Sequence, residues 1–185
     1  KPCWKKRNSK MIKIILFFFF LLFNLNLESS EKNNIIDNFK KIKNLSFDFK
    51  QTINGKTESG QCIVEYPKKI NCSYNVRNNK KLVSNGKSLV IVNKNNQYYH
   101  YALERTPFQL LLDKKYILNQ MKKINGELIS NKYYKYSIKS ENNEINIFFN
   151  KNNYQIIGWQ TEDIYQNLVV TYIYNLKTNN KINKN

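Results

Sequence analysis

Hydrophobic and polar residues alternate along most of this chain, with the period of two that predicts β-strands with one buried face. In residues 45–53, for example, Phe47 and Phe49 alternate with polar side chains. Asn85-Gly86 lies between two later alternating segments and is a strong hairpin signal. The same alternation predicts further strands at residues 60–66, 70–76, 80–84, 87–92, 97–103, 133–139, 144–150, 154–163 and 167–175.

Two segments have a different pattern. Residues 31–43 carry apolar side chains at helical spacing, with Lys and Asn opposite, which predicts an amphipathic helix. Residues 107–118 form a short apolar run between polar neighbours and predict a second helical segment. About ten antiparallel strands joined by hairpins favour a strongly curved sheet or barrel. An open sheet would need these two helical segments to cover its apolar concave face.

The first thirty residues look like a targeting segment. Met11 and Lys13 precede an apolar run, residues 14–23, and small residues follow at Ser29 and Ser30. This is the pattern of a secretory signal peptide, too short for a comfortable membrane span. An uncleaved N-terminal anchor is the alternative.

Domain boundaries follow from this reading. Residues 1–29 are predicted to be an upstream extension plus the signal peptide, with cleavage near Ser29. Residues 30–178 are predicted to be one domain, with no interdomain linker, and residues 179–185 a frayed tail. The apolar run has no cysteine at its end to lipidate, so we expect a soluble exported protein.

The composition is basic, with 31 Lys and Arg against 13 Asp and Glu and a formal charge of +18. Such a balance can indicate nucleic acid, acidic lipid or an acidic protein as partner. The lysines are scattered, however, and no nucleic-acid-binding motif is present. A solvated basic surface is the simpler interpretation, and a basic module for nucleic acid or anionic membrane stays an alternative.

Candidate catalytic chemistry is sparse. The single histidine, His100, lies in a Tyr-rich strand with no nucleophile motif beside it. There is no glycine-rich phosphate loop and no CxxC or HExxH spacing. The sequence therefore predicts no catalytic residues, no metal and no cofactor, and a hydrolase that uses His100 is the weakest alternative.

Two cysteines flank the turn near Pro67. In a hairpin symmetric about that residue, Cys62 and Cys72 lie directly opposite each other, at about the 4.5–5.5 Å Cβ separation of cross-strand pairs. That separation is close to what a disulfide tolerates, and export would permit oxidation. A disulfide and two buried thiols both remain open.

Aromatic residues make up 14% of the chain. Each of them could be ordinary core, but as a set on a concave sheet they could line a site for an acyl chain. Burial of each methylene contributes roughly 0.8 kcal/mol. A carrier of acyl chains through water therefore needs such an apolar hollow. The set comprises Phe47, Phe49, Tyr74, Tyr99, Tyr101, Phe148, Phe149 and Trp159.

Four stretches in order resemble the outer-membrane lipoprotein carrier family, LolA. Residues 45–51 resemble its aromatic first strand ending in Gln, and residues 60–74 its unit of glycine, strand, proline and strand. Residues 82–89 resemble its V-S-D-G-K-x-L hairpin, with Asn in place of Asp. Residues 106–111 resemble its T-P-x-x-L-L turn, which opens a lid helix.

The resemblance implies a mainly β fold, an incomplete, half-open antiparallel barrel of about eleven strands with a helical lid. It implies a monomeric periplasmic carrier of triacylated lipoproteins, without cofactor or nucleic acid. The carrier would accept cargo from a LolCDE-like inner-membrane ABC transporter. It would deliver cargo to a LolB-like receptor or directly to the outer membrane. Another exported lipid- or lipoprotein-binding sensor on the same fold is the alternative.

We expect the acyl-binding hollow to be formed by Phe47, Phe49, Val64, Tyr74, Leu89, Ile91, Phe149 and Trp159, and the lid by Ile35, Phe39, Pro107, Phe108, Leu110 and Leu111. One position departs from the family. Where the family often has an Arg before the proline of the strand unit, holding the lid shut, this chain has Tyr66. Its hydroxyl can make one hydrogen bond, but it cannot make the charge-assisted bonds of a guanidinium.

Overall fold

The computed structural model describes residues 30–75, 80–93, 95–141, 143–163 and 165–181. The chain divides into two units, Lys1–Asn34 and Ile35–Asn185, and the fold described below is that of the second unit. The predicted upstream extension and signal peptide lie outside the described residues, so these boundaries stay predictions.

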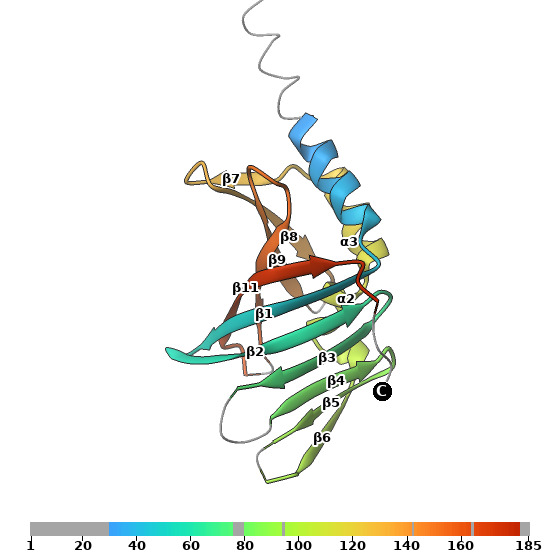
Figure 1. Cartoon of the computed structure of the whole chain (residues 1–185), viewed down its shortest axis with the longest axis vertical. Coiled ribbons are helices and arrows are strands. Elements are labelled where there is room, and N and C mark those ends of the chain that lie inside the picture. The colour runs from blue at the N-terminus through green and yellow to red at the C-terminus, as the bar shows by residue number, and fades with distance from the viewer. Residues whose placement is uncertain (1–29, 76–79, 94, 142, 164, 182–185) are drawn as a thin grey trace, which may run out of the picture. The chain divides into compact units, whose positions relative to one another are not determined.

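Eleven strands form one antiparallel sheet in the order β6-β5-β4-β3-β2-β1-β11-β10-β9-β8-β7 (Figure 1). The first strand pairs with both the second and the last, so the N-terminal and C-terminal halves of the sheet are continuous. The edge strands β6 and β7 do not pair with each other, and the sheet therefore stays open. The strands are β1 Asn44–Ile53, β2 Lys56–Glu65, β3 Lys69–Tyr74, β4 Lys81–Asn85, β5 Ser88–Val92, β6 Tyr98–Ala102, β7 Glu127–Ile129, β8 Tyr133–Lys139, β9 Glu144–Asn150, β10 Ile156–Glu162 and β11 Leu168–Thr178.

The predicted mainly β fold with an open antiparallel sheet is confirmed, and every predicted strand is present. Sequence reasoning missed β7, because three residues are too few to establish an alternation. It also began β2 four residues late. The first residues of that strand are polar and at least partly exposed, so they lack a buried face to reveal them.

Helices account for the segments that broke the alternation. Residues 30–41 are helical. The predicted segment 107–118 forms two helices, α2 Phe108–Leu112 and α3 Lys114–Lys123, preceded by the 3₁₀ turn η1 Leu103–Arg105. The chain divides at Asp113, whose carboxylate accepts a hydrogen bond of 3.0 Å from the backbone N–H of Tyr116 and so caps α3. α3 packs against β8, and α2 packs against β9.

The core lies between the inner face of the sheet and the helices. Phe39, from the N-terminal helix, meets Phe149 edge to face with ring centroids 5.7 Å apart, and Phe149 meets Tyr136 in the same way at 5.8 Å. Gly60 lets the sheet pack this closely, because a Cβ there would lie 2.2 Å from the carbonyl oxygen of Ser73 and 2.8 Å from the ring of Phe49.

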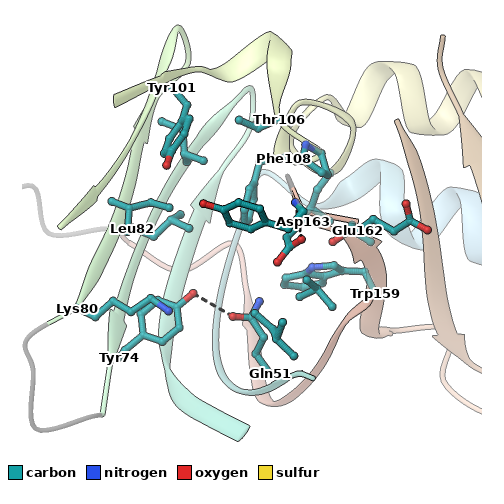
Figure 2. A pocket seen from close by; sticks show the side chains of 18 residues that line it. Gln51, Tyr74, Lys80, Leu82, Tyr101, Thr106, Phe108, Trp159, Glu162 and Asp163 are labelled. Atoms are coloured by element: carbon teal, nitrogen blue, oxygen red, sulfur yellow. Dashed lines mark hydrogen bonds between the residues drawn. The ribbon is translucent and has the colours of Figure 1, made fainter. Parts of the chain in front are cut away.

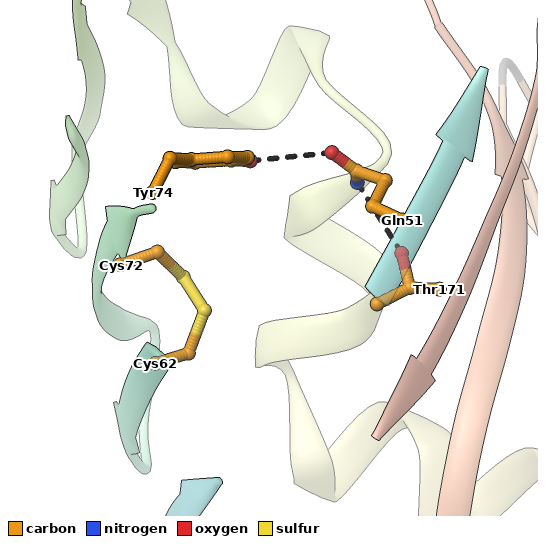
Figure 3. Close-up of a disulfide and its surroundings, with 5 residues drawn as sticks. All are labelled: Gln51, Cys62, Cys72, Tyr74 and Thr171. Atoms are coloured by element: carbon orange, nitrogen blue, oxygen red, sulfur yellow. Dashed lines mark hydrogen bonds between the residues drawn. A yellow bond between two sulfur atoms is a disulfide. The ribbon is translucent and has the colours of Figure 1, made fainter. Parts of the chain in front are cut away.

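A disulfide joins Cys62 on β2 to Cys72 on β3 (Figure 3). The two residues are direct register partners, as the symmetric hairpin predicted. Both face the core and are at most 5% exposed. The disulfide therefore fixes the β2–β3 hairpin at the point where it contacts the core.

Candidate functional site

A cavity of about 260 Å³ lies between the inner face of the sheet and α2 (Figure 2). β1, β4 and β5 contribute apolar side chains to its wall, and β10 contributes Trp159. Its lining is mostly hydrophobic, with a few polar groups. The lining residues are Gln51, Ile53, Tyr74, Lys80, Leu82, Leu89, Ile91, Tyr101, Thr106, Pro107, Phe108, Leu111, Trp159, Thr161, Glu162, Asp163, Tyr165 and Val169.

The residues predicted to line the hollow fall into two groups. Tyr74, Leu89, Ile91 and Trp159 line the cavity. The other four pack in the core and are at most 4% exposed; they are Phe47, Phe49, Val64 and Phe149. Whether any of the eight contacts an acyl chain stays a prediction.

Helix side chains explain this division. Alternation identifies which side chains face inward, but it does not show how far along each strand the helices fill the trough. Ile35 and Phe39 are at most 1% exposed and occupy one end of the inner face. The cavity remains at the other end, where the β1–β2 and β10–β11 turns lie.

The predicted lid divides in the same way. Pro107, Phe108 and Leu111 line the cavity and form the part of its wall that comes from α2. Ile35, Phe39 and Leu110 are buried in the core instead. The short helix α2 is therefore the element that would have to move for the cavity to open widely.

A chain of hydrogen bonds crosses the wall of the cavity. The hydroxyl of Tyr74 donates to Oε1 of Gln51 at 3.3 Å, and Nε2 of Gln51 donates to Oγ1 of Thr171 at 3.2 Å (Figure 3). Burial raises the pKa of Tyr74, and the nearby carboxylate of Glu58 adds to the rise. Sequence reasoning missed this network, although the polar Gln51 at an inward position of an apolar alternation was a signal for it.

The β10–β11 turn forms one side of the cavity. Oδ1 of Asp163 accepts from the backbone N–H groups of Tyr165 and Asn167, at 2.8 and 2.9 Å. Burial alone would raise the pKa of Asp163. The hydrogen bond from the Asn167 side chain and those from the two backbone N–H groups outweigh it and lower that pKa. Tyr165 is 78% exposed at this edge.

Tyr66 lies where the N-terminal helix meets the sheet. Its ring meets Phe39 edge to face with centroids 6.0 Å apart, and its backbone N–H donates to the carbonyl of Lys43 at 3.0 Å. Burial raises the pKa of its hydroxyl. The structure thus gives Tyr66 packing and backbone contacts, and a locking role for its hydroxyl stays a prediction.

A lysine from the lid itself makes the charged contact at this junction. Nζ of Lys114, the first residue of α3, donates to the carbonyl of Lys40 at 3.1 Å and to that of Ile42. It also lies 5.4 Å from the centroid of the Tyr66 ring. These carbonyls end the N-terminal helix, where a cation is favourable. Burial lowers the pKa of Lys114.

The β2–β3 turn provides a second attachment for the lid. The backbone N–H of Lys68 donates to the carbonyl of Leu112 at 3.1 Å. Its Nζ lies 3.8 Å from a carboxylate oxygen of Asp113, in a half-exposed ion pair that we expect to contribute little. α2 and α3 are therefore held at both the sheet and the N-terminal helix.

The family model for the outer membrane lipoprotein carrier protein LolA matches residues 40–185. That range includes the whole sheet together with α2 and α3. The chain belongs to the LolA family. LolA proteins are binding and carrier proteins rather than enzymes, so the alternative of a hydrolase is set aside.

The chain is also similar to several solved structures. LprF from Mycobacterium bovis is 12% identical with a TM-score of 0.46, covering 86% of this chain and 97% of its own. A putative outer membrane lipoprotein-sorting protein domain from Vibrio parahaemolyticus is 5% identical with a TM-score of 0.46, covering 81% and 93%. MucB is 9% identical with a TM-score of 0.44, covering 85% and 60%. No curated protein matches this LolA-family sequence.

Two further observations concern the described part of this LolA-family chain. Within it, no helix has the length and apolar character required to cross a bilayer. Nor do three or more His, Cys, Asp or Glu side chains come together there as a metal site. His100 is exposed on the edge strand β6.

Proposed function

We propose that this protein is a periplasmic carrier that binds acyl chains of lipoproteins and moves them from the inner to the outer membrane. The observation that supports this most directly is the apolar cavity beneath α2, in a member of a lipoprotein carrier family. Cargo would come from a LolCDE-like ABC transporter and go to a LolB-like receptor or directly to the outer membrane. The carrier would act as a monomer exported by its signal peptide.

Cavity size favours a mechanism in which the lid moves. Pockets for drug-sized ligands have volumes of roughly 300–1,000 Å³. The cavity, at about 260 Å³, is slightly smaller and cannot hold three long acyl chains. Movement of α2 and α3 away from the sheet would join the cavity to the apolar surface that the helices now cover, where Phe47 and Phe149 lie. The predicted acyl-binding residues of the core would then become available.

Opening of the lid must offset part of the binding free energy for such a carrier to release its cargo. Each methylene that leaves water contributes roughly 0.8 kcal/mol to binding. Part of that gain is offset when the lid separates from the core residues it covers. Binding is therefore modest, as a carrier that transfers its ligand requires.

Mass spectrometry of the protein after export tests this function. We expect lipidated polypeptide to co-purify from periplasmic extract, and free lipid alone would instead favour a lipid-binding sensor. The matched variants are Ile91→Glu, which places a charge in the cavity wall, and Val90→Glu, which makes the same change at the adjacent half-buried position on the other face of β5. Only Ile91→Glu should abolish cargo binding. Equal amounts of bound lipidated polypeptide in both variants would contradict the assignment of this cavity as the acyl-binding site.

A further inference from the structure

Hydrogen-bonding side chains form one row across a mostly apolar inner face. Gln51 on β1 is the direct register partner of Glu58 on β2 and of Thr171 on β11, and Thr171 is in turn the partner of Trp159 on β10. On β1 the inward residues before this row are all apolar, from Leu45 to Phe49. The row therefore interrupts the hydrophobic inner face at a single register position across adjacent strands, beside the cavity.

Hydrogen-bonding capacity remains unused in this row. The Gln51 amide has two N–H donors and two acceptor sites, and its bonds to Thr171 and Tyr74 use one of each. In the part of the chain that the structure describes, the indole N–H of Trp159 donates to no side chain or backbone group, and its ring meets Phe47 edge to face. Gln51, Tyr74 and Trp159 all line the cavity (Figure 2).

A pure hydrocarbon is a poor match for this wall. It would displace water from Gln51 and Trp159 without replacing the hydrogen bonds, and unmatched polar groups in a dry site are unfavourable. A carbonyl oxygen can accept from both donors. An acyl chain in a lipid carries such a carbonyl where its ester or amide linkage begins.

We propose that the cavity selects acyl chains by their ester or amide carbonyl, which accepts hydrogen bonds from the Gln51 amide and the Trp159 indole. This rests on the proposed function, because it assigns a chemical class to the ligand of that cavity. The hydrocarbon tail lies against Leu82, Leu89 and Leu111, and the linkage lies at the polar row.

The charged lining residues fit this orientation. Nζ of Lys80 lies 2.5 Å from a carboxylate oxygen of Glu58 and 4.2 Å from the centroid of the Tyr74 ring. Glu162 and Asp163 line the cavity from β10 and its following turn. Charged groups thus line the cavity at two places, where the polar part of a lipid can interact with them.

A matched pair of competitors tests the proposal. Methyl laurate and tetradecane have equal numbers of chain atoms and differ in the ester, and both are supplied from cyclodextrin complexes. Each displaces a dansylated fatty acid from the intact protein, and the quantity measured is the ratio of the tetradecane Kd to the methyl laurate Kd. The cyclodextrin complexes that supply the competitors are the same for every variant. A change in this ratio between variants therefore reflects a change in binding by the protein.

We expect Gln51→Leu to lower the ratio roughly 2- to 12-fold, the effect of one hydrogen bond. Gln160→Leu makes the same chemical change outside the cavity lining and should leave it at the wild-type value. An unchanged ratio in Gln51→Leu would overturn the proposal. Should circular dichroism show that this variant does not fold, Trp159→Phe decides alone: a lower ratio supports the proposal and an unchanged ratio overturns it.

The same assay separates failure of this inference from failure of the proposed function. If neither competitor displaces the probe from the wild-type protein, the cavity is not an acyl site and both fail. If both displace it and the ratio does not respond to the variants, only the selectivity fails. Where the ratio does respond to the variants, two acyl sources are compared as competitors, S-diacylglyceryl cysteine and phosphatidylethanolamine. Displacement by either supports ester recognition and the tighter one names the source, whereas displacement by neither overturns it.

Discussion

Replacement of Lys114 by methionine should loosen the lid without disturbing the sheet. Nζ of Lys114 donates to the carbonyls of Lys40 and Ile42 at the end of the N-terminal helix and lies over the ring of Tyr66. Methionine preserves most of the aliphatic length and removes the charge. The carbonyls then lose their donor, and the N-terminal helix loses its link to α3.

The size of the effect follows from two opposing contributions. A hydrogen bond that involves a charged group contributes about 1.5–3 kcal/mol, and Lys114 makes two of them. Against this, the ammonium is partly desolvated, as its lowered pKa indicates, and the exposed carbonyl of Lys40 can bind water in the variant. We expect a net loss of about 1–2 kcal/mol, which corresponds to a roughly 5- to 30-fold increase in lid opening.

Hydrogen exchange measured by mass spectrometry reports this opening directly. In Lys114→Met, peptides that cover residues 107–123 should exchange faster, while those from β1 and β2 keep their protection. Lys115→Met is the matched control, since Lys115 is the next residue of α3 and its side chain is exposed. Lys114→Arg keeps the charge and should restore most of the protection. Equal protection of residues 107–123 in Lys114→Met and Lys115→Met would refute the reasoning that Lys114 holds α3 against the N-terminal helix.

Three further predictions concern other parts of the molecule. Replacing both Cys62 and Cys72 by serine should lower the free energy of unfolding by about 3 kcal/mol, the loop-closure value for a disulfide of this span. Urea denaturation of the oxidised wild-type protein and of the variant measures the difference, and equal stabilities would contradict this prediction. Phe149→Ala should cost about 3–5 kcal/mol in the same assay because the ring is fully buried, and an unchanged stability would contradict its place in the core. Because its folded-state pKa is lowered, Asp163 stabilises the β10–β11 turn above its unfolded pKa of about 3.9 and loses this effect as pH falls further. NMR should then show the amide resonances of Tyr165 and Asn167 shifting below pH 4, and Asp163→Asn should abolish that transition.

Strand prediction succeeded wherever one face of a strand is buried, as in β1 and β9, because burial there imposes a strict alternation. It failed for β7 and for the start of β2, where half-exposed or very short segments carry no such pattern. The cysteine pairing was predictable for a related reason. Register in a tight hairpin follows from the position of its turn, so it needs no long-range information.

The candidate site was predictable only in part. Period identified the apolar face of each strand without fixing that it points inward, and Phe47 and Phe149 belong to the filled half of the trough and Tyr74 and Trp159 to the open half. Nothing in a local pattern distinguishes them, since the difference lies in which helix side chain covers each position. Lys114 could not be found at all, because its acceptors lie more than seventy residues away along the chain.

The sequence by itself determined which long segments are strands, which two cysteines lie opposite each other in a hairpin, and the LolA-like order of motifs. All of these depend on periodicity and turn chemistry, which act over a few residues. Only the tertiary structure decided which face of each strand points inward, where the trough stays empty, how Gln51, Thr171 and Tyr74 connect across strands, and that Lys114 contacts the end of the N-terminal helix. Those features depend on packing between segments distant in sequence, and packing is settled only when the helices lie on the sheet.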